Sequence, residues 1–165
     1  MLALMLADPQ RLTSADADRW ARQLDSWDLC DGFAYDLMSR TRFRWKKPAV
    51  WTRSRHEFVR RAGYALIAGL AVHDREAPDE RFIDVLPLVV AGATDSRNFV
   101  RKAVNWALRQ IGKRNRHLNR AAIACAGQVA RLDAPSARWV ASDALRELRS
   151  PAVQQRLARA SSRRA

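Results

Sequence analysis

The stretch Phe58-Val-Arg-Arg-Ala62 recurs as Phe99-Val-Arg-Lys-Ala103, 41 residues further along the chain. The pair Trp139-Val140 echoes its opening another 40 residues on. An internal period of this size indicates that the chain is built from similar supersecondary units. Such units bury their apolar faces by stacking on one another, so the repeat indicates a fold of stacked units.

Apolar residues recur at helical spacing along almost the whole chain, and no segment alternates convincingly as a strand. The spacing predicts helices over 14–24, 28–39, 54–72, 79–91, 97–113, 118–130, 136–148 and 151–160. Breaks between them are marked by Pro48, Pro78, Thr94-Asp95-Ser96, Pro135 and Ser150-Pro151. Helix pairs with a period of roughly 40–47 residues are typical of HEAT-like units. We therefore expect an all-α fold, a curved α-solenoid with a basic concave face.

A chain of 165 residues suits one domain. We expect that domain to span residues 1–160, with a frayed basic tail at 161–165. The apolar run at residues 1–7 is too short for a signal sequence or a membrane span. It reads as the last turns of a helix.

The two cysteines, Cys30 and Cys125, lie among apolar residues and form no metal-binding pattern. We expect them to be reduced core thiols of a cytoplasmic protein. The three histidines share no metal-ligand spacing, and no glycine-rich phosphate loop is present. We expect no metal, no other cofactor, no membrane association and no obligate protein partner.

The net charge is +13, and it is unevenly distributed. Residues 1–36 carry −4, so the remainder carries +17. A field of that size attracts polyanions, with nucleic acid as the first candidate and an anionic membrane surface as the second. A merely solvated basic surface is the alternative.

The predicted helix over 97–113 places one large aromatic residue away from its apolar stripe. That stripe contains Val100, Ala103, Val104, Ala107, Leu108 and Ile111. Trp106 falls on the other side, and its neighbours there are Phe99, Lys102, Arg109 and Lys113. An indole among cations is typical of a nucleic-acid surface, in which the cations hold phosphates and the aromatic ring meets a base. The alternative is that Trp106 packs under an adjacent repeat.

Two further segments bear on the same surface. Asp31 lies off the core face of the predicted helix over 28–39, and Trp27 lies at its start. Acidic residues and an apolar residue at a helix start also have a purely structural explanation. In the helix over 54–72, Arg61 flanks the buried stripe beside the small residues Ala65 and Ala68. These small residues leave room for a ligand or for close helix packing.

These residues together resemble the AlkD-like DNA alkylation repair proteins. The matching motifs are Trp27-x3-Asp31, Trp51-x2-Ser54-x3-Phe58-x2-Arg61-Ala62 and Phe99-Val-x-Lys102-Ala103-x2-Trp106-x-Leu108-Arg109. The resemblance runs from about residue 20 to residue 115, in the family's order and spacing. Phe58 stands where a tryptophan is expected, and the family's first helices precede the point at which this chain begins.

The resemblance implies a glycosylase that removes N3- or N7-alkylated purines from double-stranded DNA. It assigns the catalytic carboxylate to Asp31 and the aromatic pair around the lesion to Trp27 and Trp106. Arg61 would hold a phosphate beside the site. Lys102, Arg109 and Lys113 would add backbone contacts, an assignment that rests equally on their helix face.

The alternative function is a HEAT-like module that binds nucleic acid or a protein partner without catalysis. Most solenoids are scaffolds, so the fold alone favours this alternative. The combination of one carboxylate with tryptophans and arginines favours the enzyme.

Overall fold

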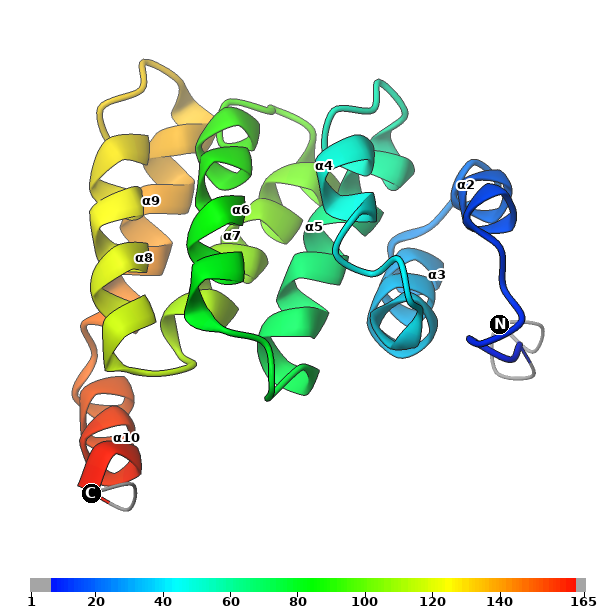
Figure 1. Ribbon diagram of the computed structural model, residues 1–165. Helices are drawn as coiled ribbons and strands as arrows, with labels where there is room; N and C mark the ends of the chain where they lie inside the picture. The colour runs from blue at the N-terminus through cyan, green and yellow to red at the C-terminus, as the bar shows by residue number, and fades with distance from the viewer. Residues whose placement is uncertain (1–6, 163–165) are drawn as a thin grey trace.

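The computed structural model describes residues 7–162 of the chain, and every regular element within them is helical (Figure 1). The elements are α2 (Ser14–Ala21), α3 (Trp27–Asp31), the π-helical turn η1 (Gly32–Leu37), the 3-10 turn η2 (Met38–Arg40), α4 (Lys47–Trp51), α5 (Glu57–His73), α6 (Asp79–Gly92), α7 (Asn98–Gly112), α8 (Arg116–Val129), α9 (Pro135–Leu148) and α10 (Pro151–Ser162). The prediction of an all-α fold is confirmed. The expectations for the opening run and for the end of the tail fall outside the described residues.

Two details of the predicted helices are wrong. Pro48 is a breaker in the sequence pattern, yet it lies in the first turn of α4. Proline is tolerated there because the first turn of a helix has no partner for its N–H groups. The single helix predicted over 28–39 is instead α3, η1 and η2 in succession, because the backbone changes its hydrogen-bonding period at Gly32 and Met38.

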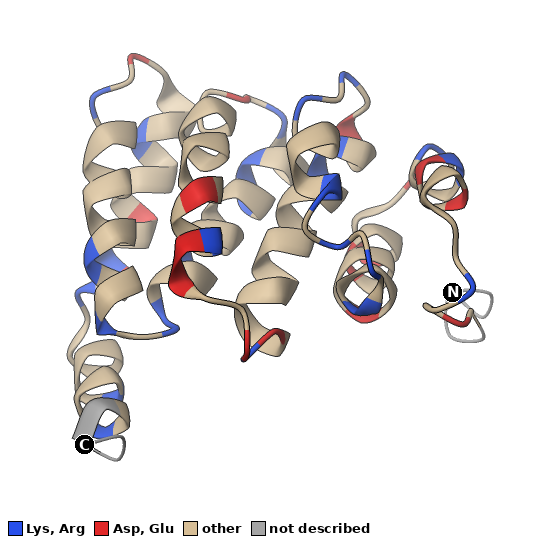
Figure 2. Cartoon of the chain, in the orientation of Figure 1, with Lys and Arg blue, Asp and Glu red and all other residues tan. Residues whose placement is uncertain are grey.

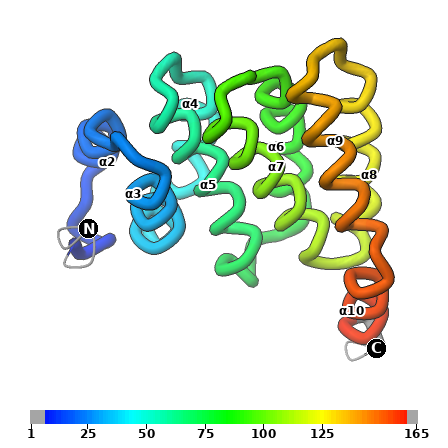
Figure 3. Tube along the Cα trace, turned by 180° about the vertical axis from the view of Figure 1, so that it is seen from behind, coloured from blue at the N-terminus to red at the C-terminus, as the bar shows by residue number. Residues whose placement is uncertain are grey.

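The helices pair and stack in two layers. In Figure 1, α4, α6 and α8 lie in front of α5, α7 and α9, and Figure 3 shows the second layer from behind. Two copies of the repeated motif begin at equivalent places in that second layer, since Phe58 and Phe99 are each the second residue of their helix, α5 and α7, whereas Trp139 is the fifth residue of α9. This arrangement confirms the internal repeat. We call the surface formed by α3, α5, α7 and α9 the site face.

The centre of the core is α5. Every residue from Arg61 to Ala71 is buried, because α3, η1, α4 and α7 all pack against this helix. The two cysteines belong to the same interior, where both are free and buried. Burial raises the pKa of each thiol to about 12. They are therefore protonated and inert at neutral pH, as expected of core thiols.

Close packing of α5 against α6 depends on a residue without a side chain. Tyr64 is 1% exposed, and its hydroxyl donates a hydrogen bond to the carbonyl of Leu88 at 2.9 Å. The ring passes over Gly92, where an added Cβ would overlap the hydroxyl oxygen and stand 2.5 Å from Cζ. Gly127 on α8 has nothing within 4 Å of such a Cβ.

These two glycines give opposite predictions for the same substitution. Gly92→Ala must displace Tyr64, and overpacking of this kind costs roughly 1–3 kcal/mol. Gly127→Ala fills open space and gains helix propensity of about 0.5–1 kcal/mol. Urea unfolding of both variants measures the difference. Equal stability of the two variants would contradict the packing described for Tyr64.

Candidate nucleic-acid interface

A clamped carboxylate lies where α3 meets α5. Arg61 donates from Nε to Asp31 Oδ1 at 3.0 Å and from Nη2 to Oδ2 at 2.7 Å. Its third nitrogen, Nη1, donates to the carbonyl of Phe99 at 2.8 Å. Paired bonds of this kind fix the plane of the carboxylate as well as its position. Arg61 of α5 therefore holds Asp31 of α3 in one orientation, and the carbonyl of Phe99 on α7 in turn anchors Arg61.

Burial differs across this ion pair. The side chain of Arg61 is 7% exposed, whereas that of Asp31 is 24% exposed. Burial raises the pKa of the Asp31 carboxyl above its ordinary range, and the hydrogen bonds and charge of Arg61 oppose that shift. The guanidinium engages both carboxylate oxygens, and the Asp31 side chain as a whole remains partly accessible to solvent.

Trp27 begins α3, one helical turn before Asp31. Residues four apart lie on the same side of a helix, so the indole and the carboxylate share a face. Trp27 is 53% exposed, a large value for a tryptophan. Of the sequence-predicted residues, Trp27 and Asp31 share a helix face, and the packing of α3 on α5 brings Arg61 to Asp31.

The contacts of Trp106 match the second alternative, packing against neighbouring parts of the fold, and the residue remains partly exposed. It packs partly against the core. Its ring also stacks on Tyr35 of η1, with centroids 5.7 Å apart and planes at 12°. Sequence reasoning missed Tyr35. The signal was its spacing, because Trp27, Asp31 and Tyr35 follow one another at intervals of four.

The three predicted cations of α7 have different surroundings. Lys102 is exposed. Arg109 is hydrogen-bonded to Glu147 of α9 and lies 3.7 Å from Asp143. Lys113 pairs with the other oxygen of Glu147 at 2.6 Å. Two of the three cations are therefore engaged by acids of the next repeat, and the expected basic face is partly neutralised at this end.

The acids of α9 were also missed in the sequence. Asp143 and Glu147 are four residues apart and so share one helix face, which is the available signal. Asn105 donates to Asp143 at 2.6 Å, which extends the network. Burial favours a higher pKa for Glu147, but the hydrogen bond from Lys113 and the charge of Arg109 outweigh it and lower the pKa.

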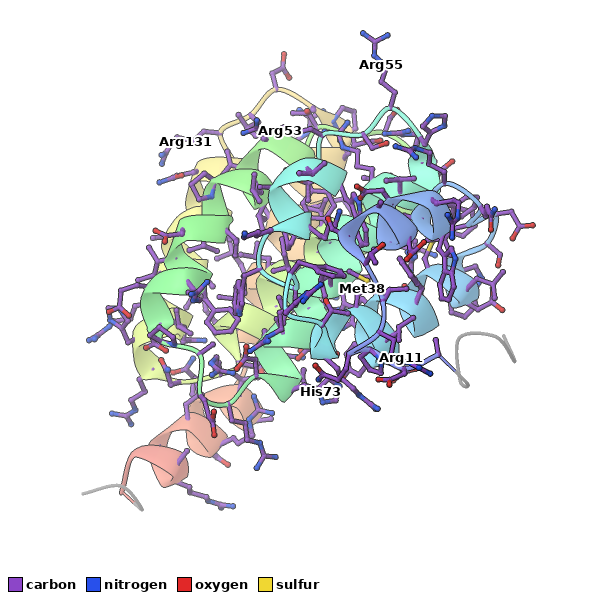
Figure 4. The ribbon with its side chains drawn as sticks, turned by 45° about the vertical axis from the view of Figure 1, so that its right-hand side comes forward. Arg11, Met38, Arg53, Arg55, His73 and Arg131 are labelled. Carbon is purple, nitrogen blue, oxygen red and sulfur yellow. The ribbon has the colours of Figure 1, made fainter. Side chains whose placement is uncertain are left out.

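Further arginines lie on the loops between the helices. Arg53 and Arg55 lie on the loop before α5, and Arg131 lies on the loop before α9. Figure 4 shows all three along one edge of the molecule, with His73 at the opposite edge. Figure 2 shows basic residues, with some acidic ones among them, on several of the loops at the same edge. A row of cations with this spread suits an extended polyanion.

Within residues 7–162, no group of three or more His, Cys, Asp or Glu has the arrangement of a metal site. None of the helices described has both the length and the hydrophobicity needed to cross a bilayer.

Comparisons with known proteins bear on the fold and the family. Curated protein sequences contain no match to this chain. A solved structure described as "A new family of proteins related to the HEAT-like repeat DNA glycosylases with affinity for branched DNA structures" is similar, with a TM-score of 0.69 and 19% identity. The similarity covers 94% of this chain and 68% of that one. It confirms the HEAT-like fold.

A match to a model of a protein family identifies the family of this chain. The model described as DNA alkylation repair enzyme matches residues 1–158. That range contains Asp31, Arg61, Trp106 and the other residues of the site face described above. The chain belongs to the DNA alkylation repair enzyme family.

Proposed function

We propose that this protein is a DNA glycosylase that acts in the cytoplasm and removes N3- or N7-alkylated purines from double-stranded DNA. The observation that carries the proposal is the carboxylate of Asp31, clamped by buried Arg61 and one helical turn from exposed Trp27. The wide spread of cations over the site face and the adjoining loops supports DNA as the partner.

The proposed role of Asp31 follows from the chemistry of the lesion. A purine alkylated at N3 or N7 carries a positive charge and leaves without prior protonation. Positive charge then develops on the sugar, where a fixed carboxylate stabilises it. The same oxygens orient the attacking water, as the second carboxylate of a glycosidase does. The lone pairs that Arg61 leaves unused serve these two tasks.

For Arg61 we propose positioning of Asp31 in place of the phosphate contact inferred from the resemblance. Its three nitrogens already donate to Asp31 and to the carbonyl of Phe99. A guanidinium that is 7% exposed also has little surface to offer a phosphate. The clamp keeps the carboxylate from rotating when the substrate arrives, which avoids a reorganisation cost during the reaction.

Trp27 and Trp106 are proposed to favour the cationic base over a normal one. An indole face attracts a cation by about 0.5–2 kcal/mol, with the larger values in desolvated sites. The side chain of Trp27 is 53% exposed and can therefore contact such a base. One face of Trp106 is covered by Tyr35, so its contribution comes from the other face or the edge.

Asp31→Asn tests the enzymatic proposal. It removes the negative charge and keeps the shape, so excision of 7-methylguanine from methylated duplex DNA should fall by about 10²–10³. Binding to the same duplex should stay equal or tighten slightly, because a charge that repels phosphates is lost. Released base is quantified under single-turnover conditions with enzyme in excess.

The control for this experiment is a test of whether the Asp31→Asn variant is still folded. Asp31→Asn leaves the buried Arg61 without its ionic partner, and breaking a buried pair is destabilising by about 3–5 kcal/mol. Excision is therefore measured below the melting temperature of the variant, as monitored by circular dichroism. Unchanged excision by the folded variant would remove Asp31 from the mechanism.

We further propose that Arg109 and Lys113 contact DNA phosphates in competition with Glu147. Glu147→Gln should then tighten duplex binding at low salt. It should also steepen the dependence of log affinity on log salt by up to about 1.8, since Arg109 and Lys113 would each gain a phosphate contact and each contact contributes roughly 0.9. Fluorescence anisotropy over a salt series measures both quantities.

The matched control for this charge removal is Glu80→Gln on α6, in the other layer. It changes the net charge by the same amount at an exposed residue outside the Glu147 network. Affinities that change equally in the two variants would mean that only net charge matters. The pairs of Glu147 would then serve only to hold α7 and α9 together.

A second candidate function is binding of branched DNA without excision. It is favoured by the described affinity of the similar solved structure. It is also favoured by the ion pair, which compensates the charge of Asp31. Affinity for a four-way junction and for a duplex of matched length discriminates. Preference for the junction with no base release by the wild-type chain supports this candidate, and release that depends on Asp31 rejects it.

A further inference from the structure

Three aromatic rings from three different elements form a row on the site face. Trp106 of α7 stacks on Tyr35 of η1 at 5.7 Å between centroids. Tyr35 in turn meets the edge of His73, the last residue of α5, at 4.3 Å and 79°. The row crosses α5 because that helix has Gly69 at the point of contact, where an added Cβ would stand 3.1 Å from Cδ2 of Tyr35.

The backbone beneath Tyr35 is irregular. Tyr35 lies within the π-helical turn from Gly32 to Leu37, and its carbonyl accepts a hydrogen bond from the hydroxyl of Ser39 at 2.6 Å. Single π-helical turns are uncommon and occur frequently at functional sites. The ring of Tyr35 packs against Trp106 and His73, so these contacts fix its position before any ligand binds.

A hollow of about 360 Å³ adjoins the row, a volume within the range of small-ligand sites. Its lining contains Tyr35, Asp36, Ser39, Arg40, Arg44, His73 and Asp74. Asp74 is fixed by Arg44 Nε and Trp45 Nε1, each at 3.0 Å, and by the amide of Ala77 at 3.1 Å. Arg40 is exposed at the rim. The lining therefore combines aromatic rings with both hydrogen-bond donors and acceptors.

We propose that the hollow, with Tyr35 and His73 as its aromatic wall, is a subsite for an unpaired nucleobase of a bound DNA strand. The inference rests on the proposed function, because the strand must first bind the site face. An unpaired base exposes its π-face and both of its hydrogen-bonding edges, and these suit the rings and the polar groups of the lining.

A base inside a duplex does not enter this subsite, because its faces and edges are already occupied by neighbouring bases. Continuity with the rest of the site face comes from Trp106, which shares one helix face with Lys102. A strand that contacts this face reaches the hollow through Tyr35, and Arg40 then lies beside its backbone.

The experiment compares three DNA probes by fluorescence anisotropy with the full chain. They are a blunt duplex, the same duplex with a short thymidine overhang, and the same duplex with an abasic overhang of equal length. The thymidine overhang should tighten binding by about 5-fold or more, the abasic overhang should not, and Tyr35→Ala should lose the gain while keeping its affinity for the blunt duplex. Tyr35→Phe retains the ring and should keep the gain.

The control is Trp139→Ala, which removes an exposed aromatic residue on α9, and it should keep the gain. If Tyr35→Ala does not fold, His73→Ala replaces it, because His73 is exposed and its truncation should leave the fold intact. This variant should reduce the gain, because it removes the other ring of the proposed wall. Full retention of the gain in either variant overturns the subsite. So does an equal gain from the abasic overhang, or no gain in a wild-type chain that binds the blunt duplex. Failure of the wild-type chain to bind any of the three probes overturns the proposed function instead.

Discussion

The guanidinium of Arg61 is the constraint on which the site depends. From the first half of α5 it binds Asp31 on α3 and the carbonyl of Phe99 on α7, so one buried cation joins three helices. Loss of one partner from such a pair costs about 3–5 kcal/mol. The orientation of the candidate catalytic carboxylate is therefore tied to the stability of the fold. The same bonds partly neutralise that carboxylate, which is the cost of holding it in place.

Charge on the site face is arranged in the same way, by pairing between neighbouring repeats. Glu147 and Asp143 of α9 engage Arg109 and Lys113 of α7, while Lys102 remains exposed. A net charge of +13 draws DNA toward the molecule, but local pairing decides which cations are ready to meet a phosphate. Under the proposed function, DNA binding exchanges protein carboxylates for phosphates, and such an exchange depends strongly on salt.

The fold and the family do not by themselves decide between the two candidate functions. A HEAT-like solenoid serves as scaffold or as enzyme, and the similar solved structure is described by its affinity for branched DNA. The distinction lies in the partly exposed carboxylate of Asp31 and in the exposed ring of Trp27, features of side chains and not of the backbone. The subsite proposed beside the aromatic row that ends at His73 would be compatible with either function.

The sequence by itself determined the all-α class, the repeat and most helix positions, because the 3.6-residue period and the spacing of the repeat are local signals. It also determined the candidate pair Trp27 and Asp31, since both lie on one helix face. The partners of Arg61, Trp106 and Arg109 were decided only in the tertiary structure. Asp31, Tyr35 and Glu147 lie 30 or more residues away from these three in the chain, and no local pattern encodes contacts between helices so far apart. Burial of Arg61 follows from the stacking of α3 and α7 on α5, and it places the guanidinium against the carboxylate of Asp31.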